Sequence, residues 1–261
     1  SAAKLFIAGI GPGLALVLLF CGYIGVVALT SKDIVPKAAT SDPVDWARSL
    51  ADLLPFLILI LLVLGSIYLG IATPTEAAAV GCMGSFVIGK IWGRLGLSEF
   101  RQATKATVKT TGAIMLLVMM AFVFSYAIAI TGIPKQLALW VGEQEMTALT
   151  LMLFIGLVYL LMGCVIDSIG MMVITVPLLL PIVEAFGIDP ILFGIMVVLY
   201  IEIGLITPPI GLNLFVIHSL YPDGKLLTVI KGAIPFVFLL VIMVVIVWCF
   251  PEIALWLPQR M

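Results

Sequence analysis

A carboxylate and a hydroxyl stand in the middle of a long apolar stretch that runs from 147 to 182. Asp167 and Ser168 are the polar pair, and Gly163 and Gly170 flank them. Exposed backbone and an unpaired charge are costly in a helix that faces lipid, because hydrocarbon offers them no partner. We therefore predict a helical hairpin with its tip at Asp167 and Ser168. The carboxylate then either faces a site within the protein or is an ordinary surface group at a tip that reaches water.

Adjacent prolines interrupt a second apolar stretch, from 191 to 220. Pro208 and Pro209 follow Thr207, and the small and polar residues around them are Gly204, Gly211 and Asn213. Each proline removes a backbone donor and its ring clashes with the preceding turn, so we predict a discontinuous helix with free carbonyl groups. At membrane depth such carbonyls are tolerated only beside protein or a water-filled cavity. The alternative is a proline kink in a membrane helix.

A hairpin tip followed by a discontinuous helix is an arrangement that many secondary transporters use to build a midplane site. Half-helix N-termini offer a positive dipole end to anionic substrates, while unwound carbonyls and hydroxyls bind sodium. Glu202 lies shortly before the predicted break, where it either faces a cavity or pairs with a neighbouring cation. Glu76, three residues after Thr73, matches a capping box, which is a structural role.

The composition excludes several classes of protein. Of the 261 residues, 63% are hydrophobic and 10% are charged, and the mean hydropathy is +1.31. So few charges cannot cover a globule with polar surface, so we predict an all-α polytopic membrane protein and not a soluble enzyme. A net charge of −1 gives no reason to expect a nucleic-acid partner. The sequence contains neither a nucleophile elbow nor a metalloprotease histidine pair.

The cysteines form no metal-binding or disulfide pattern. They are scattered singly through apolar runs, at Cys21, Cys82, Cys164 and Cys249. A zinc site or a disulfide framework needs ligands that converge. We therefore predict inert, buried thiols and no cofactor.

Because a membrane-spanning helix needs about 20 apolar residues, the chain divides into four predicted parts. Residues 1–52 are expected to form a first transmembrane helix, over 5–29, and a cytoplasmic surface helix. Residues 53–146 hold scaffold-like transmembrane helices, with a bend at 70–74. The hairpin and the broken helix occupy 147–220. A last transmembrane helix and the C-terminus make up 221–261.

Positive charge gathers between residues 90 and 109. The cations there are Lys90, Arg94, Arg101, Lys105 and Lys109, with Glu99 as the only acid. Cytoplasmic loops of membrane proteins carry an excess of lysine and arginine. We therefore predict a cytoplasmic basic loop over 90–109.

With these residues in view, the chain resembles the large transmembrane subunit of tripartite ATP-independent periplasmic (TRAP) transporters. The resemblance rests on the stretches 5–13, 70–79, 187–194 and 204–211, which include Gly70-Ile71-Ala72-Thr73-Pro74 and Gly204-Leu205-Ile206-Thr207-Pro208-Pro209. They occur in the family's order and extend over nearly the whole chain. The match is to the C-terminal half of the subunit, its second inverted repeat.

The resemblance implies half of an elevator-type secondary transporter, built from a helical hairpin and a discontinuous helix. The expected function is sodium-coupled import of an organic acid, such as a dicarboxylate or a sugar acid, across the bacterial inner membrane. Its partners would be a small membrane subunit, a periplasmic substrate-binding protein and the first repeat of the same subunit. The alternative is a non-transporting membrane scaffold subunit, in which the breaks are only kinks.

The resemblance also implies which residues form the site. No catalytic residue is expected, and the sodium- and substrate-binding residues would be Gly163, Asp167, Ser168, Gly204, Ile206, Thr207, Pro208, Pro209, Gly211 and Asn213. Sodium is expected at the backbone oxygens of Gly204 and Ile206 and at the hydroxyl of Thr207. Asn213 would support the site or the substrate.

Overall fold

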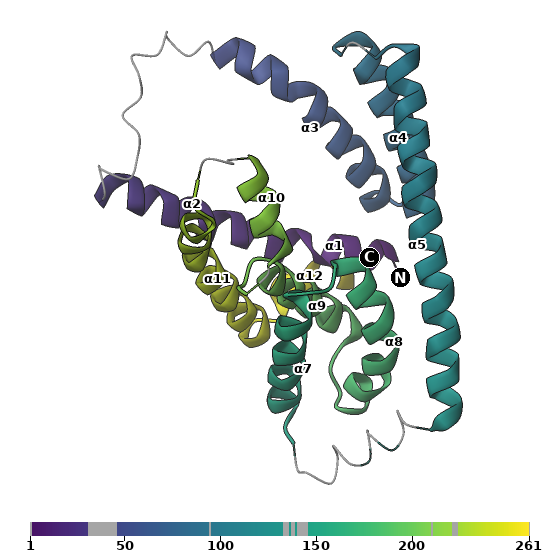
Figure 1. Cartoon of the computed structure of the whole chain (residues 1–261), viewed down its shortest axis with the longest axis vertical. Helices are drawn as coiled ribbons and strands as arrows, with labels where there is room; N and C mark the ends of the chain where they lie inside the picture. Colours follow the sequence, from purple (N-terminus) through teal and green to yellow (C-terminus); the bar gives the residue numbers. More distant parts are fainter. Residues whose placement is uncertain are drawn as a thin grey trace. The chain divides into compact units, whose positions relative to one another are not determined.

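The computed structural model describes residues 2–30, 46–93, 95–132, 136, 139, 146–209, 211–220 and 224–260. Over these residues all regular structure is α-helical (Figure 1), which confirms the predicted all-α class. Within the same residues, five helices are long and apolar enough to cross a membrane. The chain divides into two compact units, residues 1–7 with 24–111 and residues 8–23 with 112–261.

The first unit is built around a pair of packed helices, α3 (Trp46–Tyr68) and α4 (Pro74–Ile91). The helices approach closely at small residues, since a methyl group added at Gly84 would lie 2.7 Å from the Leu59 side chain. Helix α1 (Ala2–Ala8) and the later part of α2 (Ile10–Thr30) also belong to this unit. Together α1 and α2 correspond to the predicted first crossing.

The turn between α3 and α4 is the predicted bend, and it holds the predicted capping box. The Thr73 backbone N–H donates to Glu76 Oε2 at 2.8 Å, and the Glu76 backbone N–H donates back to Thr73 Oγ1 at 3.3 Å. Pro74 occupies the start of α4, where a missing N–H costs nothing. The structural role predicted for Glu76 is confirmed.

The predicted basic loop over 90–109 is wrong in its extent. Helix α5 (Leu97–Thr131) begins soon after α4 ends, so the cations from residue 101 onward lie on a helix. Glu99 stabilises this early start, because its Oε2 accepts the Gly96 N–H at 2.9 Å in front of the first turn. The predicted surface helix before 52 lies mostly outside the described residues, and its last part is the beginning of α3.

The second unit has a buried helix at its centre, α9 (Pro190–Leu205). Among the described residues five helices contact it, namely α7 (Ala148–Gly163), α8 (Ser168–Ala185), α10 (Leu212–Leu220), α11 (Leu226–Cys249) and α12 (Glu252–Gln259). Asp189 begins α9 as an N-cap, accepting the Ile191 N–H at 2.7 Å. Because α9 is covered on most sides, the helices packed around it set its position.

Hydroxyl groups connect the helices of this core. The hydroxyls of Tyr159 on α7 and Thr175 on α8 are hydrogen-bonded, and Thr175 Oγ1 also donates to the Met171 carbonyl at 2.7 Å. The Tyr200 hydroxyl on α9 donates to the Met152 carbonyl on α7 at 3.0 Å. Buried polar groups without a partner are costly, so these bonds specify how α7, α8 and α9 pack.

Candidate functional site

The hairpin predicted from Asp167 and Ser168 is present. Helix α7 ends at Gly163, a short turn follows, and α8 begins at Ser168. Asp167 is the N-cap of α8, and its Oδ2 accepts the N–H groups of Ile169 and Gly170, each at 3.1 Å. The Asp167 side chain is exposed within this chain. Its carboxylate therefore neutralises the positive end of α8.

The predicted break in the second apolar stretch is also present. Helix α9 ends at Leu205 and helix α10 (Leu212–Leu220) begins beyond the prolines. Gly211 has φ of +55°, a left-handed conformation that favours glycine, and the Pro208–Pro209 peptide bond is cis. The helix stops and restarts, so the segment is a break and not a proline kink.

The hairpin tip and the break meet, although they are far apart in the sequence. Gly163 and Gly204 pack backbone against backbone, because a methyl group added at Gly163 would lie 2.8 Å from the Gly204 Cα. Beside them, Cys164 Sγ lies 3.6 Å from the carbonyl oxygens of both Thr207 and Pro208. The structure thus brings together four predicted site residues, Gly163, Gly204, Thr207 and Pro208. Cys164, which was not predicted as a site residue, lies among them.

The hydrogen bonds of Thr207 leave oxygen lone pairs available. Its hydroxyl donates to the Ile203 carbonyl at 2.5 Å, which orients the proton back along α9. Its backbone N–H donates to the Gly204 carbonyl at 3.2 Å, and the Ile206 backbone N–H donates to the same oxygen. The Thr207 hydroxyl oxygen therefore keeps lone pairs for a cation, whereas the Gly204 carbonyl oxygen already accepts two N–H groups. Ile206, between them in sequence, is half-buried.

The remaining predicted residues lie around this junction without joining it. Ser168 is half-buried at the start of α8, and Asn213 is half-buried in the first turn of α10. Among the described residues, neither side chain makes a hydrogen bond to the break. Pro209 is exposed in this chain, as is Pro208 at the junction itself, whereas Gly211 is buried.

Cys164 is the site residue that sequence reasoning missed, and the prediction of four buried thiols is wrong. Cys164 is buried, whereas Cys21, Cys82 and Cys249 are exposed in this chain. Cys164 Sγ also lies 3.3 Å from the Leu160 carbonyl, as expected for a thiol near a helix end. The sequence prediction did not use the one signal available, the position of Cys164 directly after Gly163 inside the polar interruption.

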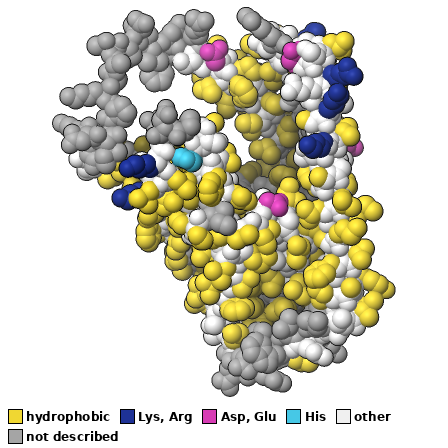
Figure 2. All heavy atoms as spheres, in the orientation of Figure 1, with side chains coloured by type: hydrophobic (Ala, Val, Ile, Leu, Met, Phe, Trp, Pro, Cys, Tyr) yellow, Lys and Arg dark blue, Asp and Glu magenta, His cyan; other side chains and the backbone are white. Residues whose placement is uncertain are grey.

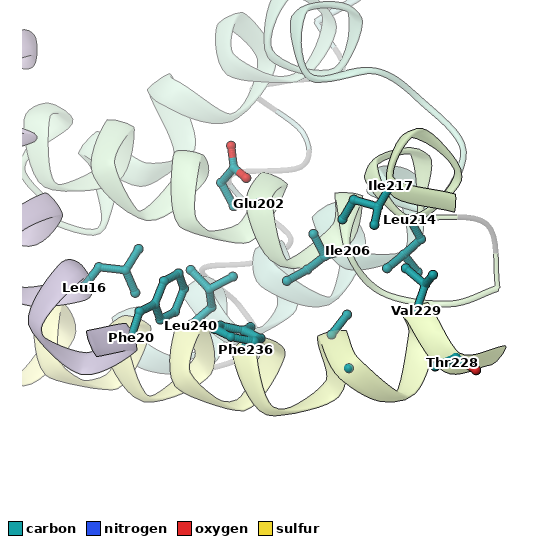
Figure 3. A pocket seen from close by; sticks show the side chains of 12 residues that line it. Leu16, Phe20, Glu202, Ile206, Leu214, Ile217, Thr228, Val229, Phe236 and Leu240 are labelled. Carbon is teal, nitrogen blue, oxygen red and sulfur yellow. The ribbon is translucent and has the colours of Figure 1, made fainter. Parts of the chain in front are cut away.

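Glu202 is exposed and borders a cavity, which is one of the two alternatives that the sequence left open. The cavity has a volume of about 670 Å³ and is lined by apolar side chains of α2, α9, α10 and α11. Figure 3 shows Glu202 on α9 and Ile206 directly after its end, with Phe20 of α2 and Phe236 of α11 on the opposite side. Among the described residues, no lysine or arginine forms an ion pair with this carboxylate.

A hairpin and a broken helix that meet at an oxygen-rich junction define a membrane-transporter type of fold. Comparison with known families gives a match over residues 1–253 to the "Tripartite ATP-independent periplasmic transporter, DctM component". The chain belongs to this family, which confirms the resemblance seen in the sequence. The family is a transporter permease and not an enzyme, and its members are bacterial inner-membrane proteins, in agreement with the apolar helices.

Proteins similar to this chain are named for several different substrates. The chain is 36% identical over 260 residues to the C4-dicarboxylate TRAP transporter large permease protein DctM of Pseudomonas aeruginosa, covering 99% of the chain and 60% of that relative. It is 34% identical to the sialic acid large permease SiaM of Vibrio cholerae, with 99% and 60% covered. It is 31% identical to the ectoine/5-hydroxyectoine large permease UehC of Ruegeria pomeroyi, with 98% and 60% covered. The chain thus spans about 60% of the length of these relatives.

Proposed function

We propose that the complete subunit that contains this chain imports an organic acid across the bacterial inner membrane, coupled to sodium. The relatives are named for a C4-dicarboxylate, a sialic acid and an ectoine, and each of these solutes carries a carboxylate. The shared chemical class of substrate is therefore a carboxylate. Which acid this subunit carries depends on side chains outside the junction described above.

The observation that supports sodium coupling is the junction between the hairpin tip and the helix break. Sodium is a hard cation and prefers oxygen ligands. In this proposal the Thr207 hydroxyl and the Ile206 carbonyl supply them, and the Gly204 carbonyl joins them when sodium replaces one of its two N–H donors. A bound cation satisfies carbonyl groups that the prolines have removed from the helix ladder. Pro208 and Gly211 shape this segment, and Gly163 closes it from the side of the hairpin.

The substrate carboxylate belongs near α10 in this proposal. Asp167 already occupies the first N–H groups of α8, so the start of α8 repels a second carboxylate. The start of α10 carries no acidic side chain, and Asn213 in its first turn supplies an amide donor. Sodium bound at the break adds positive charge beside this helix start. Prior sodium binding therefore favours entry of the anion, which couples the two.

The same packing supports movement of the hairpin and the broken helix as one body, as an elevator mechanism requires. Tyr200 and Tyr159 tie α7 to α9 and α8, and the Gly163–Gly204 contact joins the tip to the break. As the family description says tripartite and periplasmic, the proposed partners are a small membrane subunit and a periplasmic substrate-binding protein. The rest of the subunit supplies the matching repeat.

Uptake by the complete transporter tests this proposal. The full-length subunit, its small partner and its binding protein are reconstituted in vesicles, and accumulation of a labelled dicarboxylate, sialic acid or ectoine is followed with and without an inward sodium gradient. Accumulation of one acid only with the gradient supports the proposal. Uptake that is the same with and without the sodium gradient contradicts the coupling. If a correctly assembled complex takes up none of these carboxylates, the result favours a scaffold subunit.

A further inference from the structure

A stripe of positive charge runs along the first half of α5. Its members are Arg101, Lys105 and Lys109, all of them exposed. Residues four apart on an α-helix are rotated by about 40° from one another, so all three lie within about 80° of the helix surface and rise about 6 Å at each step. Figure 2 shows dark blue side chains at successive heights along this helix.

The stripe has no acidic partner in the part of the chain that the structure describes. Glu99, the acid nearest in sequence, is engaged at the start of α5, where it accepts from the Gly96 N–H at 2.9 Å and the Ser98 hydroxyl at 2.8 Å. None of the three cations forms an ion pair among the described residues. Their charge therefore has to be balanced by solvent ions or by a partner from outside this chain.

The length of α5 places the stripe next to the bilayer surface. The helix has 35 residues, which is about 52 Å, whereas the hydrocarbon core is about 30 Å thick. The apolar part begins at Gly112 and fills about 30 Å up to Thr131. Lys109 is thus one turn outside the hydrocarbon, and Lys105 and Arg101 follow at one-turn intervals, within reach of the headgroup layer for long, flexible side chains.

We propose that the Arg101–Lys105–Lys109 stripe is a binding surface for the phosphate groups of anionic phospholipids. The apolar span continues directly from the stripe, so the headgroup layer is the anionic surface that the helix meets as it leaves the membrane. Each lysine or arginine held near an anionic bilayer surface strengthens binding by about fivefold at physiological salt. The stripe thereby sets the depth and tilt of α5, independently of any transported solute.

Lipid selectivity of the intact protein tests this surface. The full chain, or the full-length subunit, is placed in phosphatidylcholine vesicles, and its preference for spin-labelled phosphatidylglycerol over spin-labelled phosphatidylethanolamine is measured. The test variant is R101Q/K105Q/K109Q, and the matched control is K4Q/K225Q/K231Q, which removes the same charge from exposed positions elsewhere. Circular dichroism and elution volume verify that both variants keep the helical fold.

We expect the test variant to lose most of its preference for phosphatidylglycerol, a several-fold drop, and the control variant to keep at least half of it. A charge-preserving R101K/K105R/K109R variant should keep the preference, and 1 M salt should abolish it in the unaltered protein because the Debye length falls to about 3 Å. Equal preference in test and control variants overturns the proposal. So does an unchanged lipid preference accompanied by loss of the small membrane subunit, which would assign the stripe to a protein contact.

Discussion

Cys164 Sγ lies 3.6 Å from the carbonyl oxygen of Thr207, across the contact between the hairpin tip and the helix break. Among the described residues, this thiol is the only hydrogen-bond donor to the Thr207 and Pro208 carbonyls. A thiol is a weak donor. Its one proton is shared among these two carbonyls and that of Leu160, which lies nearer, at 3.3 Å.

Sodium dependence of uptake should respond to the Thr207 hydroxyl. Thr207→Val keeps the branched shape and removes the hydroxyl oxygen, so we expect the sodium concentration for half-maximal uptake to rise about tenfold, the effect of losing about 1.4 kcal/mol of binding. Thr207→Ser, the matched control, keeps the oxygen and should stay within about threefold of the unaltered protein. Uptake by the reconstituted complete transporter measures both. An unchanged sodium dependence in Thr207→Val would assign the ions to another site.

Removal of the Cys164 thiol should also change the sodium concentration needed for half-maximal uptake. Cys164→Ala leaves the Thr207 and Pro208 carbonyls without their donor, and we expect half-maximal uptake to shift by a few-fold, with Cys164→Ser restoring it. Cys249→Ala, in the same unit but exposed, is the control and should change nothing. Protection of Cys164 from a thiol reagent by sodium gives a second readout. A thiol that reacts equally with and without sodium would place the cation away from Cys164.

The contact between Gly163 and Gly204 should tolerate no side chain. A methyl group at Gly163 would meet the Gly204 Cα at 2.8 Å, and the neighbour is backbone that cannot rotate away. Gly163→Ala should therefore destabilise the protein by about 1–3 kcal/mol, as overpacking does. Gly112→Ala, where nothing lies within 4 Å, should be neutral or stabilising by up to about 1 kcal/mol. Thermal unfolding in detergent measures the difference, and equal midpoints for the two variants would refute the close contact.

Because Asp167 caps α8, its substitution by asparagine and by alanine should affect stability differently. Asparagine also accepts N–H bonds at an N-cap, so Asp167→Asn should retain stability, whereas Asp167→Ala should lose about 1 kcal/mol. Thermal unfolding distinguishes them, and an equal loss in both variants would mean that the charge, not the cap, stabilises α8. If uptake falls in Asp167→Asn while stability holds, the carboxylate acts in transport as well as in capping.

The basic segment between 90 and 109 should face the cytoplasm. Gln102→Cys, introduced into a variant without native cysteines, is exposed on α5 among the cations. It should resist an impermeant thiol reagent in intact cells and react after lysis, because the positive-inside rule keeps this end inside. Gln136→Cys, beyond the far end of α5, is the control and should react in intact cells. Labelling of Gln102→Cys before lysis would reverse the topology.

Much of the fold follows from local chemistry that the sequence displays. Pro208 and Pro209 stop a helix wherever they occur, because a proline has no N–H and its ring obstructs the previous turn. Asp167 and Thr73 begin helices because their side chains accept first-turn N–H groups. The length and apolarity of the hydrophobic runs also predict membrane helices, because a helix needs about 20 apolar residues to cross the hydrocarbon core. The family could also be predicted from the sequence, because the motifs within 5–13, 70–79, 187–194 and 204–211 occur along the chain in the family's order.

Only the tertiary structure decided which of these local features meet. Nothing in the types of Gly163 and Gly204 states that their backbones touch, and the single Cys164 could not be told from the exposed Cys21 and Cys249 by composition. Helix α5 also begins earlier in the chain than the sequence predicted, because Glu99 accepts the Gly96 N–H. Arg101, Lys105 and Lys109 therefore lie on this helix and not in a loop. Contacts between distant segments depend on how whole helices pack around α9. That packing is a sum of many small interactions, which residue types and spacings alone do not determine.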